Sequence, residues 1–316
     1  MKTQRYKRTL MFMTLLLSVM MLTSCHYKYF DDYEGFLKVK VVLDYSHMDT
    51  TDAKPKVMKV VFYPTDKSFQ PVSYNIKDSA YVDVPVASYR VFTYNDDSEI
   101  NRAGGVDDTS SVPLIYTGRA NYRGLFPKDS LDNTLYYDFP DRLFTDCKLA
   151  SVSGDIYTTQ PDDNRIVLYP EERTRRVEVV ADGLKNLKYV NGVRISLDGI
   201  QHEYVPNLWS YTNTYVPLVS DASKDDDRNR IESYLYSFGF NEGKHYLQIF
   251  LQGNGFNRIL RFDVTEQVIR QLNNSDTMKI YVNAVYDAYD DVPVNVSSGF
   301  NIGVDDWYNN DVPLNM

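Results

Sequence analysis

Short segments in which apolar and polar residues alternate constrain the fold of this chain more than any other feature. Residues 37–44 are the first of them, with apolar side chains at Leu37, Val39, Val41 and Leu43. Successive side chains of an extended chain point to opposite faces, so a period of two indicates a strand with one buried face. The same argument predicts further strands at 58–63, 81–84, 89–94, 177–181, 193–197, 234–240, 245–252, 259–264 and 279–286, with weaker candidates at 133–139 and 165–169.

A single segment is predicted to be helical. In residues 265–274, Val268 and Leu272 lie one turn apart, and Thr265 is placed to cap the first turn. Many short strands, turn-rich connections and one short helix predict an all-β protein built from antiparallel Greek-key β-sandwiches. Two series of strands, without a repeat in sequence, indicate an N-terminal sandwich at 36–170 and a C-terminal sandwich at 171–316.

The N-terminal segment indicates export and attachment to a membrane. Four basic residues within the first eight positions precede an apolar run from Leu10 to Leu22, which is shorter than the roughly 20 residues that a membrane span needs. Leu22-Thr23-Ser24-Cys25 ends this run as a bacterial lipobox does. We therefore predict a lipoprotein signal peptide at 1–24, a lipidated Cys25 and a tether at 25–35. An ordinary secretory signal followed by a chance cysteine is the alternative.

The charge of the mature chain excludes one class of partner. Removal of residues 1–24 takes away four basic residues and no acidic one, so the formal net charge falls from −9 to −13 over 292 residues. Without a basic patch, such a chain repels nucleic acid. The acylated Cys25 also leaves Cys147 without an intrachain disulfide partner. Cys147 is predicted to be a small buried strand residue, with a nucleophile as the alternative.

No motif of catalysis or cofactor binding is present. The histidines have no metal-ligand spacing, and no nucleophile elbow, phosphate loop or dinucleotide fingerprint occurs. We therefore predict no enzyme, no cofactor and no metal. Paired acids such as Asp96-Asp97 and the run from Asp225 to Asp227 are compatible with calcium, but the alternating ligand loop is missing and solvated loops are favoured.

Aromatic residues suggest a second type of binding. The chain contains 27 tyrosines, and its two tryptophans, Trp209 and Trp307, have tyrosine neighbours. Aromatic faces stack on sugar rings, so both tryptophans are candidate contacts for a glycan. Packing in a core or at a sheet edge is the alternative, and it is favoured.

Three segments, together with the lipobox, carry a resemblance to a known family. They are residues 173–179 (Arg-Thr-Arg-Arg-Val-Glu-Val), 183–187 (Gly-Leu-Lys-Asn-Leu) and 299–307 (Gly-Phe-Asn-Ile-Gly-Val-Asp-Asp-Trp). The chain resembles the Bacteroidales fimbrillin superfamily, and most closely an uncharacterised Bacteroides lipoprotein branch. The resemblance implies two transthyretin-like sandwiches, a pilus or adhesion role and no cofactor.

The chain departs from the stalk subunits of that superfamily. In those subunits an arginine-directed protease removes the first strand, and a segment of another pilin subunit fills the groove by strand addition. Here no arginine lies between Cys25 and Arg90, and the loop after the first strand offers only Lys54, followed by Pro55, and Lys56. We expect an uncut fimbrial anchor or accessory subunit, held on the outer membrane at the cell surface. An outer-membrane glycan-binding lipoprotein is the alternative.

Overall fold

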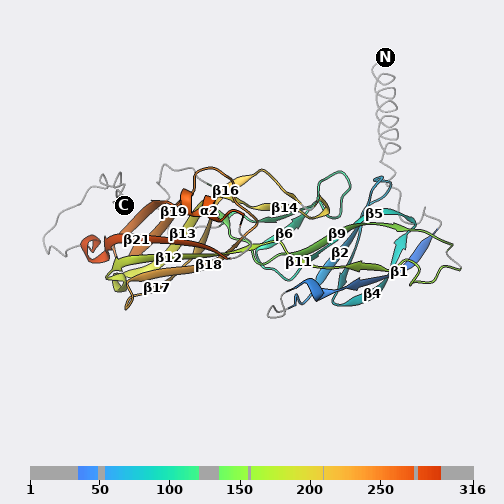
Figure 1. Cartoon of the computed structure of the whole chain (residues 1–316), viewed down its shortest axis with the longest axis horizontal. Helices are drawn as coiled ribbons and strands as arrows, with labels where there is room; N and C mark the ends of the chain where they lie inside the picture. Colours follow the sequence, from blue (N-terminus) through green and yellow to red (C-terminus); the bar gives the residue numbers. More distant parts are fainter. Residues whose placement is uncertain are drawn as a thin grey trace, which may run out of the picture.

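The computed structural model describes residues 35–48, 54–120, 135–155, 158–208, 210–273 and 277–292. Strands form most of the regular structure, which confirms the all-β prediction. Figure 1 shows two groups of strands at opposite ends of an elongated molecule, with β6 and β14 between them.

The first sandwich packs a three-stranded sheet on a five-stranded sheet. The smaller sheet has the order β10 (Ile166–Leu168), β1 (Phe36–Leu43) and β4 (Ser79–Pro85). The larger sheet has the order β11 (Glu171–Glu172), β9 (Phe144–Val152), β5 (Ala87–Asn95), β2 (Met58–Pro64) and β3 (Val72–Ile76). The four alternating apolar side chains of β1 are at most 5% exposed and face the core between these sheets, as their period predicts.

The second sandwich repeats this architecture with a larger core. One sheet has the order β17 (Ser223–Asp225), β18 (Arg230–Ser237), β12 (Arg175–Lys185) and β21 (Met278–Asp287). The other has the order β20 (Phe256–Asp263), β19 (Tyr246–Gly253), β13 (Val190–Gln201), β16 (Tyr215–Asp221) and β8 (Tyr137–Asp138). Short 3-10 turns complete the fold at η2 (Tyr45–His47), η3 (Leu187–Tyr189), η4 (Pro206–Leu208) and η5 (Ala288–Asp291).

The two sandwiches share one strand topology. The first strand of each lies between an antiparallel and a parallel neighbour: β1 between β4 and β10, and β12 between β18 and β21. The next strand of each sandwich also has matching neighbours. β2 lies between β3 and β5, and β13 lies between β16 and β19. The pairing is therefore not purely antiparallel, because each Greek key brings its first strand beside a late strand that runs the same way.

A small sheet joins the sandwiches. Its order is β15 (Ser210–Tyr211), β14 (Glu203–Val205), β7 (Leu114–Thr117) and β6 (Asn101–Gly104). Strands from opposite sides of the predicted boundary pair in this sheet, β7 with β14, and also in the larger sheet of the second sandwich, β8 with β16. A buried set, which we call the junction cluster, fills the space beside the small sheet: Val61, Tyr63, Phe92, Tyr94, Val106, Ile115, Leu143, Tyr204 and Phe238. The exact domain boundary stays a prediction.

Two local predictions are corrected. The pattern of residues 58–63 predicted one polar face, yet Val61 and Tyr63 are buried, because the junction cluster covers that face of β2. The helix among the described residues, α2, spans Thr265–Gln271. Thr265 is its first helical residue and not its cap, and the Thr265 hydroxyl accepts a hydrogen bond from the backbone N–H of His245 at 2.9 Å.

Candidate interaction site: the first strand and the junction

The first strand, β1, is the element on which the cleavage hypothesis depends. It pairs with β4 from Phe36 to Val42, but with β10 only over Val41 to Leu43. The described residues give its N-terminal half a single strand neighbour, supplemented by a hydrogen bond from the Lys40 N–H to the Pro161 carbonyl at 3.3 Å. Among the described residues, one edge of this half therefore has no strand neighbour.

The core holds β1 firmly. Each of its buried Val or Leu side chains contributes about 1.5–3 kcal/mol relative to an exposed position. Removing β1 would also expose the inward faces of β4 and β10 on either side of it. Such an opened groove has unpaired strand edges and needs a replacement strand.

The residues that a protease would have to reach differ in access. Lys54 and Lys56 are exposed, and Pro55 between them is buried. The N–H of Lys56 donates to Asp97 at 2.9 Å. Arg90 lies inside β5, paired with Tyr63 on one side and Leu149 on the other. Proteases cut extended, exposed loops, so Arg90 does not offer a site in the folded protein.

The arginines near the predicted boundary are also held in structure. The N–H of Arg173 donates to the Leu143 carbonyl at 2.8 Å, and its own carbonyl accepts from the Tyr211 hydroxyl at 2.9 Å. Arg175 and Arg176 belong to β12 and pair with residues of β18. Their backbone is therefore unavailable without local unfolding.

A shallow hollow of about 210 Å³ lies where η4 meets the first sandwich. Its lining consists of Arg90, Cys147, Lys148, Leu149, Asn207 and Leu208. Cys147 is half-buried in β9, with its sulfur 3.6 Å from the Asn207 carbonyl and its side chain against the junction cluster. This setting fits the structural role predicted for Cys147, although the residue is not fully buried.

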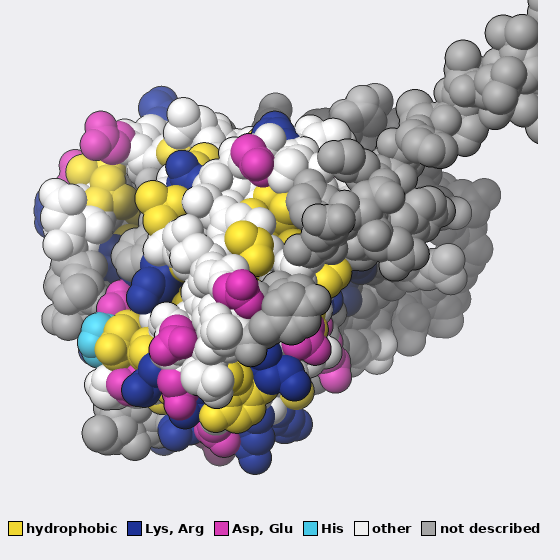
Figure 2. Space-filling view, turned by 90° about the vertical axis from the view of Figure 1, so that its right-hand side faces the viewer, with side chains coloured by type: hydrophobic (Ala, Val, Ile, Leu, Met, Phe, Trp, Pro, Cys, Tyr) yellow, Lys and Arg dark blue, Asp and Glu magenta, His cyan; other side chains and the backbone are white. Residues whose placement is uncertain are grey.

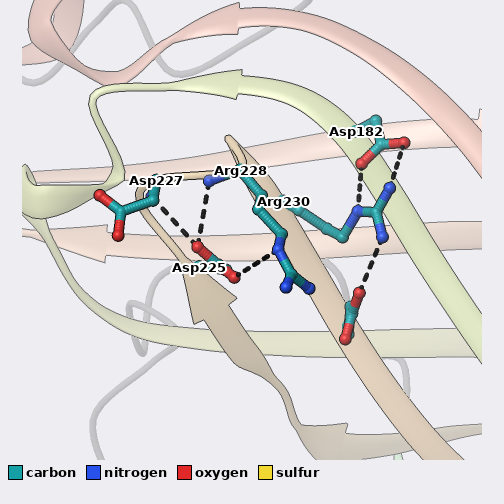
Figure 3. Close-up of polar contacts among 6 residues, drawn as sticks. Asp182, Asp225, Asp227, Arg228 and Arg230 are labelled. Carbon is teal, nitrogen blue, oxygen red and sulfur yellow. Dashed lines mark hydrogen bonds and ion pairs between the residues drawn. The ribbon is translucent and has the colours of Figure 1, made fainter.

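Acidic side chains, among them Asp225 of the run from Asp225 to Asp227, stabilise a turn and the neighbouring strands. Figure 3 shows Asp225 accepting from the N–H groups of Asp227 and Arg228, at 3.1 Å and 3.0 Å. Arg230 pairs with Asp182 at 2.5 Å and with Glu232 at 3.1 Å. Hydrogen bonds from nearby backbone N–H groups to an Asp side chain, as at Asp225, are common in turns. The described part of the chain contains no group of three His, Cys, Asp or Glu side chains that could hold a metal ion.

One exposed leucine and one exposed tyrosine lie close in sequence to Trp209, one of the predicted glycan contacts. Cys25, Trp209 and Trp307 all lie outside the described residues. Beside Trp209 in sequence, Leu208 is 52% exposed and Tyr211 is 37% exposed, so this segment reaches the surface. Figure 2 shows basic and acidic side chains interspersed with small apolar patches on the end of the molecule formed by the first sandwich.

No described helix has the length and apolar character needed to cross a membrane.

Comparisons with known proteins agree on the fold. The sequence profile called Domain of unknown function (DUF5119) matches residues 24–219, and no curated protein matches the chain significantly. A candidate adhesin from Bacteroides ovatus is 21% identical, with a TM-score of 0.62 over 82% of this chain and 97% of that chain. The fimbrial anchor protein Mfa2 from Porphyromonas gingivalis is 12% identical, with a TM-score of 0.50 over 79% and 90%.

Candidate polysaccharide-binding proteins (DUF1812) from Bacteroides thetaiotaomicron are 8% identical, with a TM-score of 0.50 over 78% of this chain and 89% of that chain. At these identities the likeness concerns the fold. It confirms, at the level of architecture, the resemblance to fimbrillin-like proteins.

Proposed function

Because this chain belongs to the DUF5119 family, a family of unknown function, and has the fold of Bacteroidales candidate adhesins and of a fimbrial anchor, we propose a structural role at the cell surface. The protein is a fimbrial anchor or accessory subunit that acts in adhesion or pilus assembly and is attached to the membrane by lipid. Its partners are the membrane, through lipid on Cys25, and pilin subunits, through strand addition. We propose that it resides on the outer membrane and has no enzymatic activity.

The observation that carries this proposal is the protected first strand. β1 lies within its sheet with its apolar face buried, and the first arginine after Cys25, Arg90, is paired within β5. An arginine-directed protease of the stalk-maturation type therefore finds no arginine between Cys25 and β5. A mature chain that keeps β1 also keeps the tether and the lipid proposed on Cys25.

The tether supports an anchoring role by its length. The eleven residues of the tether, 25–35, reach at most about 40 Å when fully extended. The first sandwich is therefore held close to the membrane. Two or more acyl chains give the stable attachment that such a role requires.

The mature N-terminus provides the test. The protein should be isolated from its native membrane and its N-terminal peptide analysed by mass spectrometry. We expect an acylated Cys25 followed by an uncut chain through β1. A mature N-terminus beyond Leu43 would instead place the protein among subunits that exchange their first strand.

Isolation of pili tests the proposed role in assembly, separately from the lipid attachment. We expect the protein at the base of purified pili, and we expect its deletion to change pilus length or attachment. Its absence from pili, combined with normal pili after deletion, would contradict the assembly role while leaving the lipid anchor intact.

A second candidate function is glycan binding at the surface. The exposure of Leu208 and Tyr211 beside Trp209 favours it. The protein should then bind at least one sugar on a glycan array, and Trp209→Ala or Trp307→Ala should abolish that binding. No retained sugar, or binding that both variants preserve, removes this candidate.

A further inference from the structure

The outer edge of β21 is a potential strand-pairing surface. β21 is the last strand of its sheet and pairs with β12 on one side. Among the described strands, none pairs with its other side. An open edge presents a row of backbone N–H and C=O groups, which can template pairing with another chain.

Two glutamine side chains of α2 occupy this edge. Gln271 Oε1 accepts from the Lys279 N–H at 2.9 Å, and Gln271 Nε2 donates to the Lys279 carbonyl at 2.8 Å. Gln267 makes the same pair of bonds with Tyr281, both at 2.8 Å. The two glutamines are four residues apart and so lie on one face of the helix. Together they satisfy the groups that a neighbouring strand would satisfy.

The rest of the edge is distorted by a bulge. The register between β12 and β21 shifts between Asp182 and Leu184. Gly183 sits at this shift with φ +82°, and a Cβ there would lie 2.4 Å from the Ala284 carbonyl oxygen. Bulges twist a strand edge away from further pairing. Thus the glutamines cover the edge at Lys279 and Tyr281, and the bulge distorts it further along, after Asn283.

The equivalent edge of the first sandwich is also met by a side chain. Its counterpart of β21 is β10, the parallel neighbour of β1. The Val167 carbonyl of β10 accepts a hydrogen bond from Lys148 Nζ at 3.2 Å. In both sandwiches a side chain, and not a strand, meets this edge.

We propose that Gln267 and Gln271 form an edge cover that prevents β21 from pairing with β21 of a second copy of this chain. A second copy is the relevant occupant because it presents the same edge and can pair with it antiparallel about a twofold axis. Attachment of many copies to one membrane surface, which the proposed function implies, raises their local concentration. The edge cover itself rests only on the contacts of α2 with β21.

The helix supplies a matched control for the test. Glu266 and Arg270 have the same spacing on α2, pair with each other at 2.6 Å, and are 81% and 76% exposed in their side chains. E266A/R270A therefore changes the helix surface without touching β21. Q267A/Q271A removes the cover, and Q267M/Q271M removes it while keeping side-chain length and helix propensity, in case the alanine variant folds poorly.

The full-length protein in non-ionic detergent would be compared by light scattering, by hydrogen exchange and by amine crosslinking through Lys279, whose side chain is 74% exposed. We expect both glutamine variants to dimerise and to form a Lys279–Lys279 crosslink between copies. In samples diluted to the monomer we also expect the Lys279 and Tyr281 amides of these variants to exchange about tenfold faster, the effect of losing one hydrogen bond each, and pairing with a second copy should protect the same amides again.

Wild-type protein and E266A/R270A should stay monomeric under these conditions. Glutamine variants that remain monomeric, even with faster exchange, would overturn the proposal, because the glutamines would then only stabilise the strand. Association of the control, association without the Lys279 crosslink, or a wild-type protein that already forms this crosslink would overturn it as well.

Discussion

Buried histidines in this protein hold the backbone in place. Both ring nitrogens of His245 lie within hydrogen-bond distance of carbonyl oxygens, 2.9 Å from Asp198 and 3.0 Å from Asn241. Gly199 makes room for this ring, because a Cβ there would lie 2.7 Å from it, and its φ is +71°. Its contacts with two backbone carbonyls thus give His245 a structural role.

His202 leads to a prediction about pH. It is buried near the junction, with its ring 4.5 Å from that of Tyr137 and Nε2 3.6 Å from Glu203. Burial lowers the pKa of His202 below its ordinary 6.5, against a smaller opposing effect of Glu203. As the pH falls below 6.5, the unfolded chain takes up the proton first, so the free energy of unfolding decreases.

Urea unfolding at pH 7.5 and pH 5 measures this effect. We expect wild-type protein to lose stability between the two pH values. His202→Phe, which keeps an aromatic ring on Tyr137 but cannot titrate, should lose less. Equal losses in both proteins would show that the junction does not depend on the charge of His202.

Strands with regular alternation were predicted well, and those with polar residues facing inward were not. β1 and β10 lie within one residue of their predicted bounds, whereas β3, β9 and β16 were not predicted. β9 explains why, because its Asp146 is nearly buried and accepts from the N–H groups of Tyr169 and Cys147 at 2.7 Å and 2.8 Å. Burial raises the pKa of Asp146. A strand that uses an inward carboxylate to bind backbone has no apolar period to detect.

The alternation of β1 predicts opposite outcomes at adjacent positions. Leu37 is 2% exposed and packs in the first core, so Leu37→Ala should lower the free energy of unfolding by about 2–5 kcal/mol. Lys38 points outward, and Lys38→Ala should change it by less than about 0.5 kcal/mol. Denaturant titration of both variants provides the measurement. Similar small losses for both would mean that β1 is loosely packed and easily displaced.

At the scale of the whole molecule, two sandwiches of one topology are joined through shared strands. Each has its first strand between an antiparallel and a parallel neighbour, although the sequence contains no visible repeat. Pairing of β7 with β14 and of β8 with β16 crosses the predicted boundary, and the junction cluster takes residues from both sides. Strand pairing and a shared apolar core couple two units more firmly than a bare linker does.

Native proteolysis tests this coupling. An arginine-specific protease should leave Arg90, Arg173, Arg175 and Arg176 uncut in the folded protein, because each lies in paired or hydrogen-bonded backbone. Arg228, whose side chain is 69% exposed in the turn before β18, serves as the accessible control. Fragment masses identify the cuts. Early release of two halves by cleavage at 173–176 would show that the boundary is an open linker.

The sequence alone determined the fold class, the helix and the burial pattern of regular strands, and it alone predicts an export signal with a lipid site at Cys25, which lies outside the described residues. These features depend on local order, because an alternating period or an apolar run is written in neighbouring residues. Tertiary structure decided the features that need distant residues to meet: the shared topology, the second buried face of β2, the junction cluster and the glutamines on β21. No local pattern distinguishes Gln267 and Gln271 from other polar helix residues, because their role depends on a strand edge that only the folded chain brings beside them.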